Sequence, residues 1–217
     1  MENQGTFLLI LQLGTGLFWI ITYILIIKRG FQDKTYGMPM VAICANISWE
    51  FIFSFIYVHN TLQRIITFSW FALDVVIMFQ YLVYGRKEFK KYISRKFFYS
   101  LFFITLGVSF LTIISITLEF KDFQGQYSAF SQNLMMSGLF ISLLLRRENL
   151  NGQSIYIAIF KMIGSLFAGI AFFIYFRTYL ITTVSVATLI YDCIYIRCVS
   201  KMHRKNLSDK VSYSAYH

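Results

Sequence analysis

Charged side chains are scarce in this sequence. Asp, Glu, Lys and Arg make up 14% of its 217 residues, whereas apolar residues make up 57% and the mean hydropathy is +0.60. A soluble globular domain carries about 25% charged residues, so this composition excludes a water-soluble fold. We expect lipid to be the solvent, and the roughly 30 Å core of a bilayer needs about 20 apolar residues per helix.

Cysteine and histidine are equally sparse, with three residues of each type. Cys44, Cys193 and Cys198 fall within or at the end of apolar segments, which favours small core residues over a disulfide framework. The histidines lie in an expected loop and in the C-terminal tail, so no cluster has the spacing of a metal site. We therefore expect neither a metal ion nor another cofactor.

Proline is nearly absent, which permits long uninterrupted helices. The single Pro39 lies where a first-turn proline is tolerated, at the start of an apolar segment. Apolar runs between charged or turn-like breaks predict an all-α bundle of seven transmembrane helices in one domain, residues 1–200. The predicted spans are 6–27, 38–58, 62–84, 97–118, 126–146, 154–176 and 179–199. Residues 201–217 are polar and basic without periodicity, and we expect a disordered tail there.

The net charge of +10 is concentrated in the segments that follow the first, third, fifth and seventh predicted spans. The alternate loops hold only Arg64, Lys121 and Arg177. By the positive-inside rule, the N-terminus faces out and the C-terminal tail is cytoplasmic. The charge thus indicates topology and contact with membrane lipids, not a nucleic-acid partner. We expect a multi-pass integral membrane protein, in the cell membrane of a bacterium or the endoplasmic reticulum of a fungus.

Three carboxylates interrupt the apolar spans near their midpoints: Glu50, Asp74 and Asp192. An ionisable group at this depth costs a few kcal/mol, so such groups usually face the protein interior and have a function there. We expect the three to converge on one cavity. The alternative is that they are protonated or hydrogen-bonded groups that hold helices together.

Polar and aromatic residues lie near the acids at helical spacing. Asn46 lies one turn before Glu50, Trp70 lies one turn before Asp74, and Tyr195 follows Asp192 by three residues. Aromatic faces stabilise cations, so a cavity lined by such rings could hold a cationic species. The candidate substrate-binding residues are Asn46, Trp49, Phe53, Trp70, Tyr81, Tyr191 and Tyr195. The alternative for any single ring is core packing.

Lys161 lies inside the predicted span 154–176, where a lysine could form a Schiff base. A Schiff-base lysine of a retinal protein normally lies on the last span, which lacks lysine here. We therefore expect Lys161 to snorkel to the cytoplasmic face. A carboxyl group away from water retains its proton more readily, so the buried acids suit either general acid catalysis or proton-coupled transport. The residues alone leave both open.

One segment has a recognisable signature. Tyr36-Gly37-Met38-Pro39, continuing through Cys44-Ala45-Asn46 to Trp49-Glu50-Phe51, resembles the second helix of the integral-membrane terpene cyclases of fungal meroterpenoid and indole-diterpene pathways, which also have bacterial relatives. Further similarity lies in Trp70 with Asp74, in Arg146-Arg147 with Gly152-Gln153-Ser154, in Lys161 and Gly164, and in Asp192.

The resemblance implies a seven-helix enzyme that protonates a linear polyprenyl or epoxypolyprenyl chain and cyclises it through carbocations without a metal. It implies that Glu50 and Asp192 are the acids, while Asp74 matches an acidic position of less certain role. The substrate would be a lipophilic isoprenoid that enters from the bilayer. A small proton-coupled transporter and a ligand-binding membrane sensor remain the alternative functions.

Overall fold

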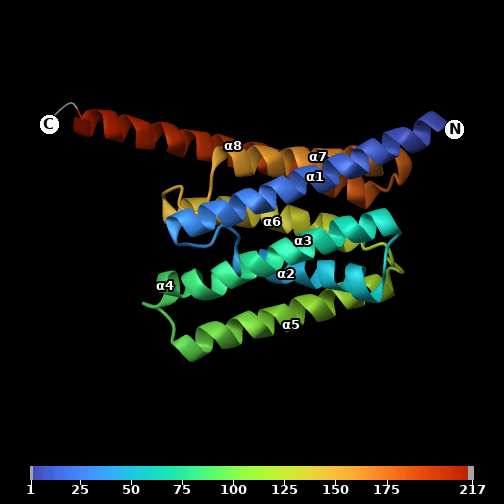
Figure 1. Cartoon of the computed structure of the whole chain (residues 1–217), viewed down its shortest axis with the longest axis horizontal. Helices are drawn as coiled ribbons and strands as arrows, with labels where there is room; N and C mark the ends of the chain where they lie inside the picture. The colour runs from blue at the N-terminus through green and yellow to red at the C-terminus, as the bar shows by residue number, and fades with distance from the viewer. Residues whose placement is uncertain (1, 215–217) are drawn as a thin grey trace.

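The structure, a computed structural model, describes the backbone of residues 2–214 and the side chains of residues 5–205. The described chain is helical and contains no strand (Figure 1). Its helices are α1 (Glu2–Asp33), α2 (Met40–Phe51), α3 (Thr61–Gln80), α4 (Arg86–Phe89), α5 (Arg95–Glu119), α6 (Gln126–Arg147), α7 (Ile155–Tyr175) and α8 (Tyr179–Ser214), with π-helical turns η1 (Ile52–Ile56) and η2 (Tyr81–Gly85).

The all-helical prediction is confirmed for the described residues. Six helices are long and apolar enough to cross a membrane, and they correspond to six of the seven predicted spans. One of them runs from Thr61 to Phe89, because η2 joins α3 to α4 without a break. The remaining apolar helix, Met40–Ile56, combines α2 with η1 and is shorter.

The C-terminal helix is longer than expected. We predicted that the last span ends near residue 199 and that a disordered tail follows from residue 201, but α8 continues through Ser214. No glycine or proline interrupts residues 199–214, and the lysines and arginines there are good helix formers. The remainder of the predicted tail, residues 215–217, lies outside the described residues.

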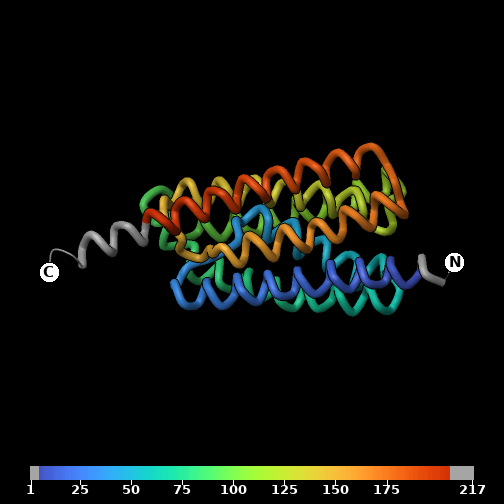
Figure 2. Tube along the Cα trace, turned by 90° about the horizontal axis from the view of Figure 1, so that it is seen from above, coloured from blue at the N-terminus to red at the C-terminus, as the bar shows by residue number. Residues whose placement is uncertain are grey.

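Helix α2 occupies the interior of the bundle. It contacts α3, α5 and α6, and its residues from Ala42 to Glu50 are all buried. On the other side, α7 lies between α1 and α8 and packs against both (Figure 2). The two termini lie at opposite ends of the bundle (Figure 1). The burial of α2 on all faces explains why its polar residues, Asn46 among them, point into protein rather than lipid.

A polar network closes the end of the bundle opposite the N-terminus. Glu88 of α4 forms ion pairs with Arg146 and Arg147 of α6. The Tyr36 hydroxyl donates to Glu88 at 2.8 Å. The pKa of Tyr36 is raised to about 12, mainly because the side chain is buried. Gly37 belongs to the same junction, because a Cβ there would lie 2.6 Å from the Gly152 carbonyl oxygen. The first part of the recognised signature and the paired arginines thus hold loops together.

Candidate functional site

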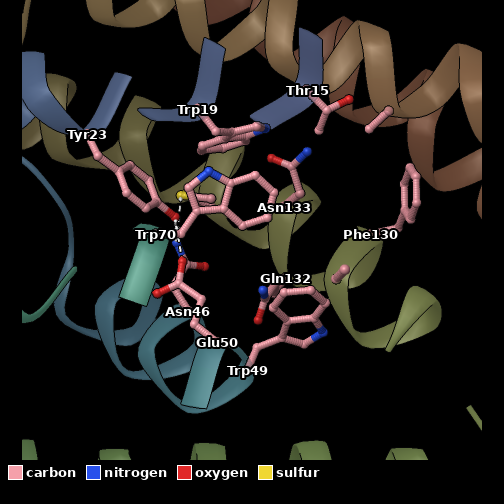
Figure 3. A pocket seen from close by; sticks show the side chains of 13 residues that line it. Thr15, Trp19, Tyr23, Asn46, Trp49, Glu50, Trp70, Phe130, Gln132 and Asn133 are labelled. Atoms are coloured by element: carbon pink, nitrogen blue, oxygen red, sulfur yellow. Dashed lines mark hydrogen bonds between the residues drawn. The ribbon is translucent and has the colours of Figure 1, made fainter. Parts of the chain in front are cut away.

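A cavity of about 110 Å³ lies at the centre of the bundle (Figure 3). Five helices line it, and together they surround the side chain of Glu50. The lining residues are Thr15, Trp19 and Tyr23 of α1, Asn46, Trp49 and Glu50 of α2, Trp70 of α3, Ala129, Phe130, Gln132, Asn133 and Met136 of α6, and Ala168 of α7.

Glu50 lies at the wall of this cavity with a chain of hydrogen bonds around it. The Tyr23 hydroxyl donates to Glu50 Oε1 at 3.2 Å, and Asn46 Nδ2 donates to the Tyr23 oxygen at 2.7 Å (Figure 3). Glu50 is 2% exposed, and its Oε2 has no hydrogen-bond partner among the described residues. One carboxyl oxygen is therefore oriented by tyrosine, and the other is buried without a donor in the described structure.

Asp74 lies behind Glu50, on the neighbouring helix α3. It is completely buried and interacts electrostatically with Glu50 and Asn46, although no hydrogen-bond donor reaches either of its oxygens at bonding geometry in the described residues. No cation pairs with Glu50 or Asp74 in this part of the structure. Two adjacent carboxyl groups away from water cannot both be ionised without a large repulsion. This arrangement therefore favours a pair of carboxyl groups that retains at least one proton.

Asp192 has a different environment. Its Oδ1 lies 2.7 Å from Lys161 Nζ and accepts a hydrogen bond from the Ser137 hydroxyl at 2.8 Å. Lys161 also donates to Ser137 at 2.6 Å, and the side chains of both charged residues are 0% exposed. The expectation that Lys161 snorkels to the membrane face is therefore wrong. A counter-ion on α8 at the same depth retains the lysine inside the bundle.

Lys161 and Asp192 do not line the cavity themselves, but Lys161 contacts residues that do. Lys161 Nζ lies 3.4 Å from Asn133 Oδ1 and 5.7 Å from the centre of the Trp19 ring, and both of these residues line the cavity. Gly164, one turn after Lys161, allows Trp19 to approach, because a Cβ there would lie 2.8 Å from the indole. Glu50 thus lines the cavity itself, whereas Asp192 lies behind Asn133.

The structure divides the predicted substrate-binding residues. Asn46, Trp49 and Trp70 line the cavity, whereas Phe53, Tyr81, Tyr191 and Tyr195 do not. Phe53 is buried against Trp49, Tyr81 packs between Tyr36 and Phe98, and Tyr195 donates to Gln153 at 2.7 Å.

Tyr191 is 44% exposed on the outside of the bundle. It directly precedes Asp192, and successive helical residues point about 100° apart, so a residue adjacent to a buried acid faces elsewhere. Helical spacing from an acid identifies a face of one helix. It does not identify which neighbouring helix completes the site.

Several cavity residues were not predicted from the sequence. Tyr23, Trp19 and Thr15 lie on α1, whose predicted span 6–27 contains no charged residue. Gln132 and Asn133 are uncharged polar residues inside the predicted span 126–146. Amides at mid-span are a signal that could have revealed this face of α6, because an amide in lipid needs partners as a carboxylate does. Among the residues searched, no three His, Cys, Asp or Glu side chains come together as a metal site.

Comparison with known proteins gives a consistent result. The sequence model of the Pyr4-like transmembrane terpene cyclases matches residues 3–205. The Pyr4-family terpene cyclase mfmH of Annulohypoxylon moriforme is 33% identical over 164 residues, which cover 73% of this chain and 66% of that protein. Terpene cyclase macJ of Penicillium terrestre is 26% identical over 164 residues, 73% of this chain and 64% of the relative.

A third relative, Asnovolin H synthase nvfL of Aspergillus novofumigatus, is 29% identical over 163 residues, 72% of this chain and 66% of its own length. The chain thus spans just under two thirds of the length of these curated relatives. No solved structure matches the chain.

Proposed function

This chain belongs to the Pyr4-like transmembrane terpene cyclases, and from this membership and its buried acid cavity we propose that it cyclises a linear isoprenoid by protonation. The observation that carries the proposal is the environment of Glu50. Its carboxyl group lines an aromatic cavity, is oriented by Tyr23, and has one oxygen without a partner in the described structure. A general acid needs a proton held in a fixed position beside the substrate, and Glu50 is held in such a position at the cavity wall.

Protonated Glu50 gives its proton to the oxygen of a terminal epoxide or to a terminal alkene carbon. Successive double bonds of the folded chain then attack the cation, and the rings of Trp19, Trp49 and Trp70 stabilise the positive charge as it moves. The final cation loses a proton to the pair of Glu50 and Asp74. Because the two carboxyl groups are adjacent, this return restores the starting state without a proton from outside.

Asp192 has a separate role in this proposal. Its carboxylate already accepts from Lys161 and Ser137, so its charge is matched within the protein. The resemblance implied that Asp192 is one of two acids. We assign it instead the role of a positioning residue, which holds Lys161 and thereby Asn133 and Trp19 at the cavity wall.

The membrane topology is also part of the proposal. Helix Met40–Ile56 has 17 residues in α2 and η1 and is enclosed by α3, α5 and α6, so we infer that it crosses as the seventh span although it is short. Protein, not lipid, surrounds most of it, and the length demanded of a lipid-exposed helix therefore does not apply. From the charge distribution we infer that the N-terminus faces out and the C-terminus faces the cytoplasm.

The test is cyclisation by the purified chain in lipid nanodiscs, with farnesol and 10,11-epoxyfarnesol as probes and mass spectrometry plus NMR of the products. We expect a cyclic isomer from at least one probe. Glu50→Gln should lower the rate by about 10²- to 10⁴-fold, the range typical of a general acid. Glu119→Gln, at an exposed carboxylate on α5, is the matched control and should behave as the parent. Equal product from folded Glu50→Gln would refute the assignment, and unaltered probes with the parent would refute the reaction.

A further inference from the structure

A second chamber of about 280 Å³ adjoins the Glu50 cavity. The two adjoin, because they share Thr15, Trp49, Trp70, Ala129, Phe130 and Ala168 as lining residues. The second chamber lies toward the N-terminal end of the bundle, where the α2–α3 and α5–α6 connections meet (Figure 1). Its remaining lining residues are Leu8, Gln12, His59, Asn60, Gln63, Gln124, Gly125, Gln126, Ala171, Phe172 and Phe176.

The polar groups of this outer chamber are neutral amides held in place by hydrogen bonds. Gln12 Nε2 donates to Gln63 Oε1 at 2.9 Å, and Gln63 Nε2 donates to Thr67 at 3.2 Å. These bonds use only part of each amide's capacity, because an amide has two donor hydrogens and an oxygen with two lone pairs. Gln12 and Gln63 therefore retain groups that can bind a ligand.

Among the side chains that the structure describes, no lysine or arginine lines the outer chamber. His59, its one titratable lining residue, has a pKa lowered mainly by burial, so it is neutral at pH 7. Asp122 lies close by and accepts hydrogen bonds from the backbone N–H groups of Gln126 and Tyr127 at the start of α6. An anionic ligand would meet no cation here and would meet a carboxylate nearby.

The two chambers thus differ in kind. The inner one is aromatic, contains the acid Glu50, and at about 110 Å³ is smaller than the roughly 300 Å³ at which pockets for drug-sized ligands begin. A linear isoprenoid whose end reaches Glu50 must therefore extend into the outer chamber.

We propose that the outer chamber is the subsite for an uncharged, hydrogen-bonding head group of the isoprenoid, bound by Gln12 and Gln63, while the reacting end lies at Glu50. This inference rests on the proposed function and adds the orientation of the substrate. The proposal disfavours prenyl diphosphates as ligands, because no described residue of the chamber offers a cation to the diphosphate.

Binding tests this without relying on turnover. The chain's three tryptophans, Trp19, Trp49 and Trp70, all line the cavity, so their fluorescence reports occupancy. The full chain in nanodiscs is titrated with farnesol, with farnesyl diphosphate, and with farnesane, a hydrocarbon of the same length without a head group. We expect the diphosphate to bind at least about tenfold more weakly than farnesol, since a buried unpaired anion is strongly disfavoured.

Gln12→Leu and Gln63→Leu should each weaken farnesol binding by about fivefold, the effect of losing one neutral hydrogen bond, and leave farnesane binding unchanged. Farnesane thus also checks that each variant is folded. Gln32→Leu, the same substitution at an exposed position on α1, is the matched control and should bind all three probes as the parent does.

Equal or tighter binding of the diphosphate would overturn the inference, as would Gln12→Leu and Gln63→Leu variants that bind farnesol as tightly as the parent. The two proposals fail separately. Cyclisation of epoxyfarnesol without head-group discrimination refutes the subsite alone, whereas discrimination without any cyclisation refutes the enzyme function and leaves the subsite in place.

Discussion

Two buried acid sites lie in this bundle, and they are built in opposite ways. Glu50 and Asp74 are adjacent carboxyl groups on α2 and α3 with no cation beside them in the described structure, whereas Asp192 on α8 is paired with Lys161 on α7. In the first site, burial and like charge favour a retained proton. In the second, Lys161 Nζ lies 2.7 Å from Asp192 Oδ1, so the acid has a basic partner. The same residue type at similar depth therefore serves either as a proton store or as a structural anchor, depending on its partner.

The comparison also separates stability from activity. Removing one member of a buried ion pair leaves an uncompensated charge, which costs several kcal/mol. Removing one of the two adjacent carboxyl groups breaks no ion pair, because neither has a cation beside it in the described structure. Variants of the Asp192 site should therefore unfold more easily, and variants of the Glu50 site should be folded but slower in cyclisation.

The largest effect on folding is expected from Lys161→Met. It leaves the Asp192 charge buried and unpaired, and should destabilise the protein by about 3–5 kcal/mol. Thermal unfolding in detergent monitored by fluorescence measures this. The double variant Lys161→Met with Asp192→Leu, which replaces both charges by apolar groups, should recover most of the loss. If the single variant is as stable as the parent, the two sites do not differ in the way described.

Asp74→Asn should have an intermediate effect, on turnover and not on folding. It removes the partner that shares a proton with Glu50, and we expect cyclisation to slow by about 10²-fold, at the lower end of general acid–base effects. The unfolding temperature should be equal to or above that of the parent, because asparagine has nearly the same size as aspartate and no ion pair is broken. A marked fall in unfolding temperature would show that Asp74 stabilises the bundle as Asp192 does.

The smallest effect is expected from Tyr23→Phe. This change removes one hydrogen bond to Glu50 and leaves Asn46 Nδ2 without its 2.7 Å acceptor. We expect cyclisation to slow by about tenfold, corresponding to roughly 1.4 kcal/mol, with KM little changed because the ring still packs against Trp19. Thr22→Ser, at the neighbouring buried position, is the control and should retain the parental rate. Should KM rise while kcat is constant, Tyr23 binds substrate and does not orient the acid.

The sequence was informative wherever a property is local. Six spans follow from hydropathy and length alone, and the depth of Glu50, Asp74 and Asp192 follows from counting within each helix. The start of α3 at the Asn60 cap is equally local, since the Asn60 side chain accepts from the Gln63 backbone N–H three residues later. The continuation of α8 beyond residue 201 was missed because polarity was taken as a sign of disorder, although it is compatible with a helix.

The pairing of the buried groups could not be read from the sequence. Lys161 is 31 residues from Asp192, and Tyr23 is 27 residues from Glu50. Hydropathy gives each residue a depth, but it does not give the rotation of one helix against the next. Lys161 was therefore expected to reach the membrane surface, whereas it is paired with Asp192 inside the bundle.

By itself, the sequence determined that this protein is a helical membrane protein with three acids placed deep in its spans, because apolar length and the cost of buried charge are properties of single segments. The tertiary structure decided which acid meets a cation, which meets another acid, and which lines a cavity. Such contacts depend on the packing of α1, α2, α3, α6, α7 and α8 around one another. Only this packing distinguishes Glu50, the proposed proton donor, from Asp192, the proposed structural anchor.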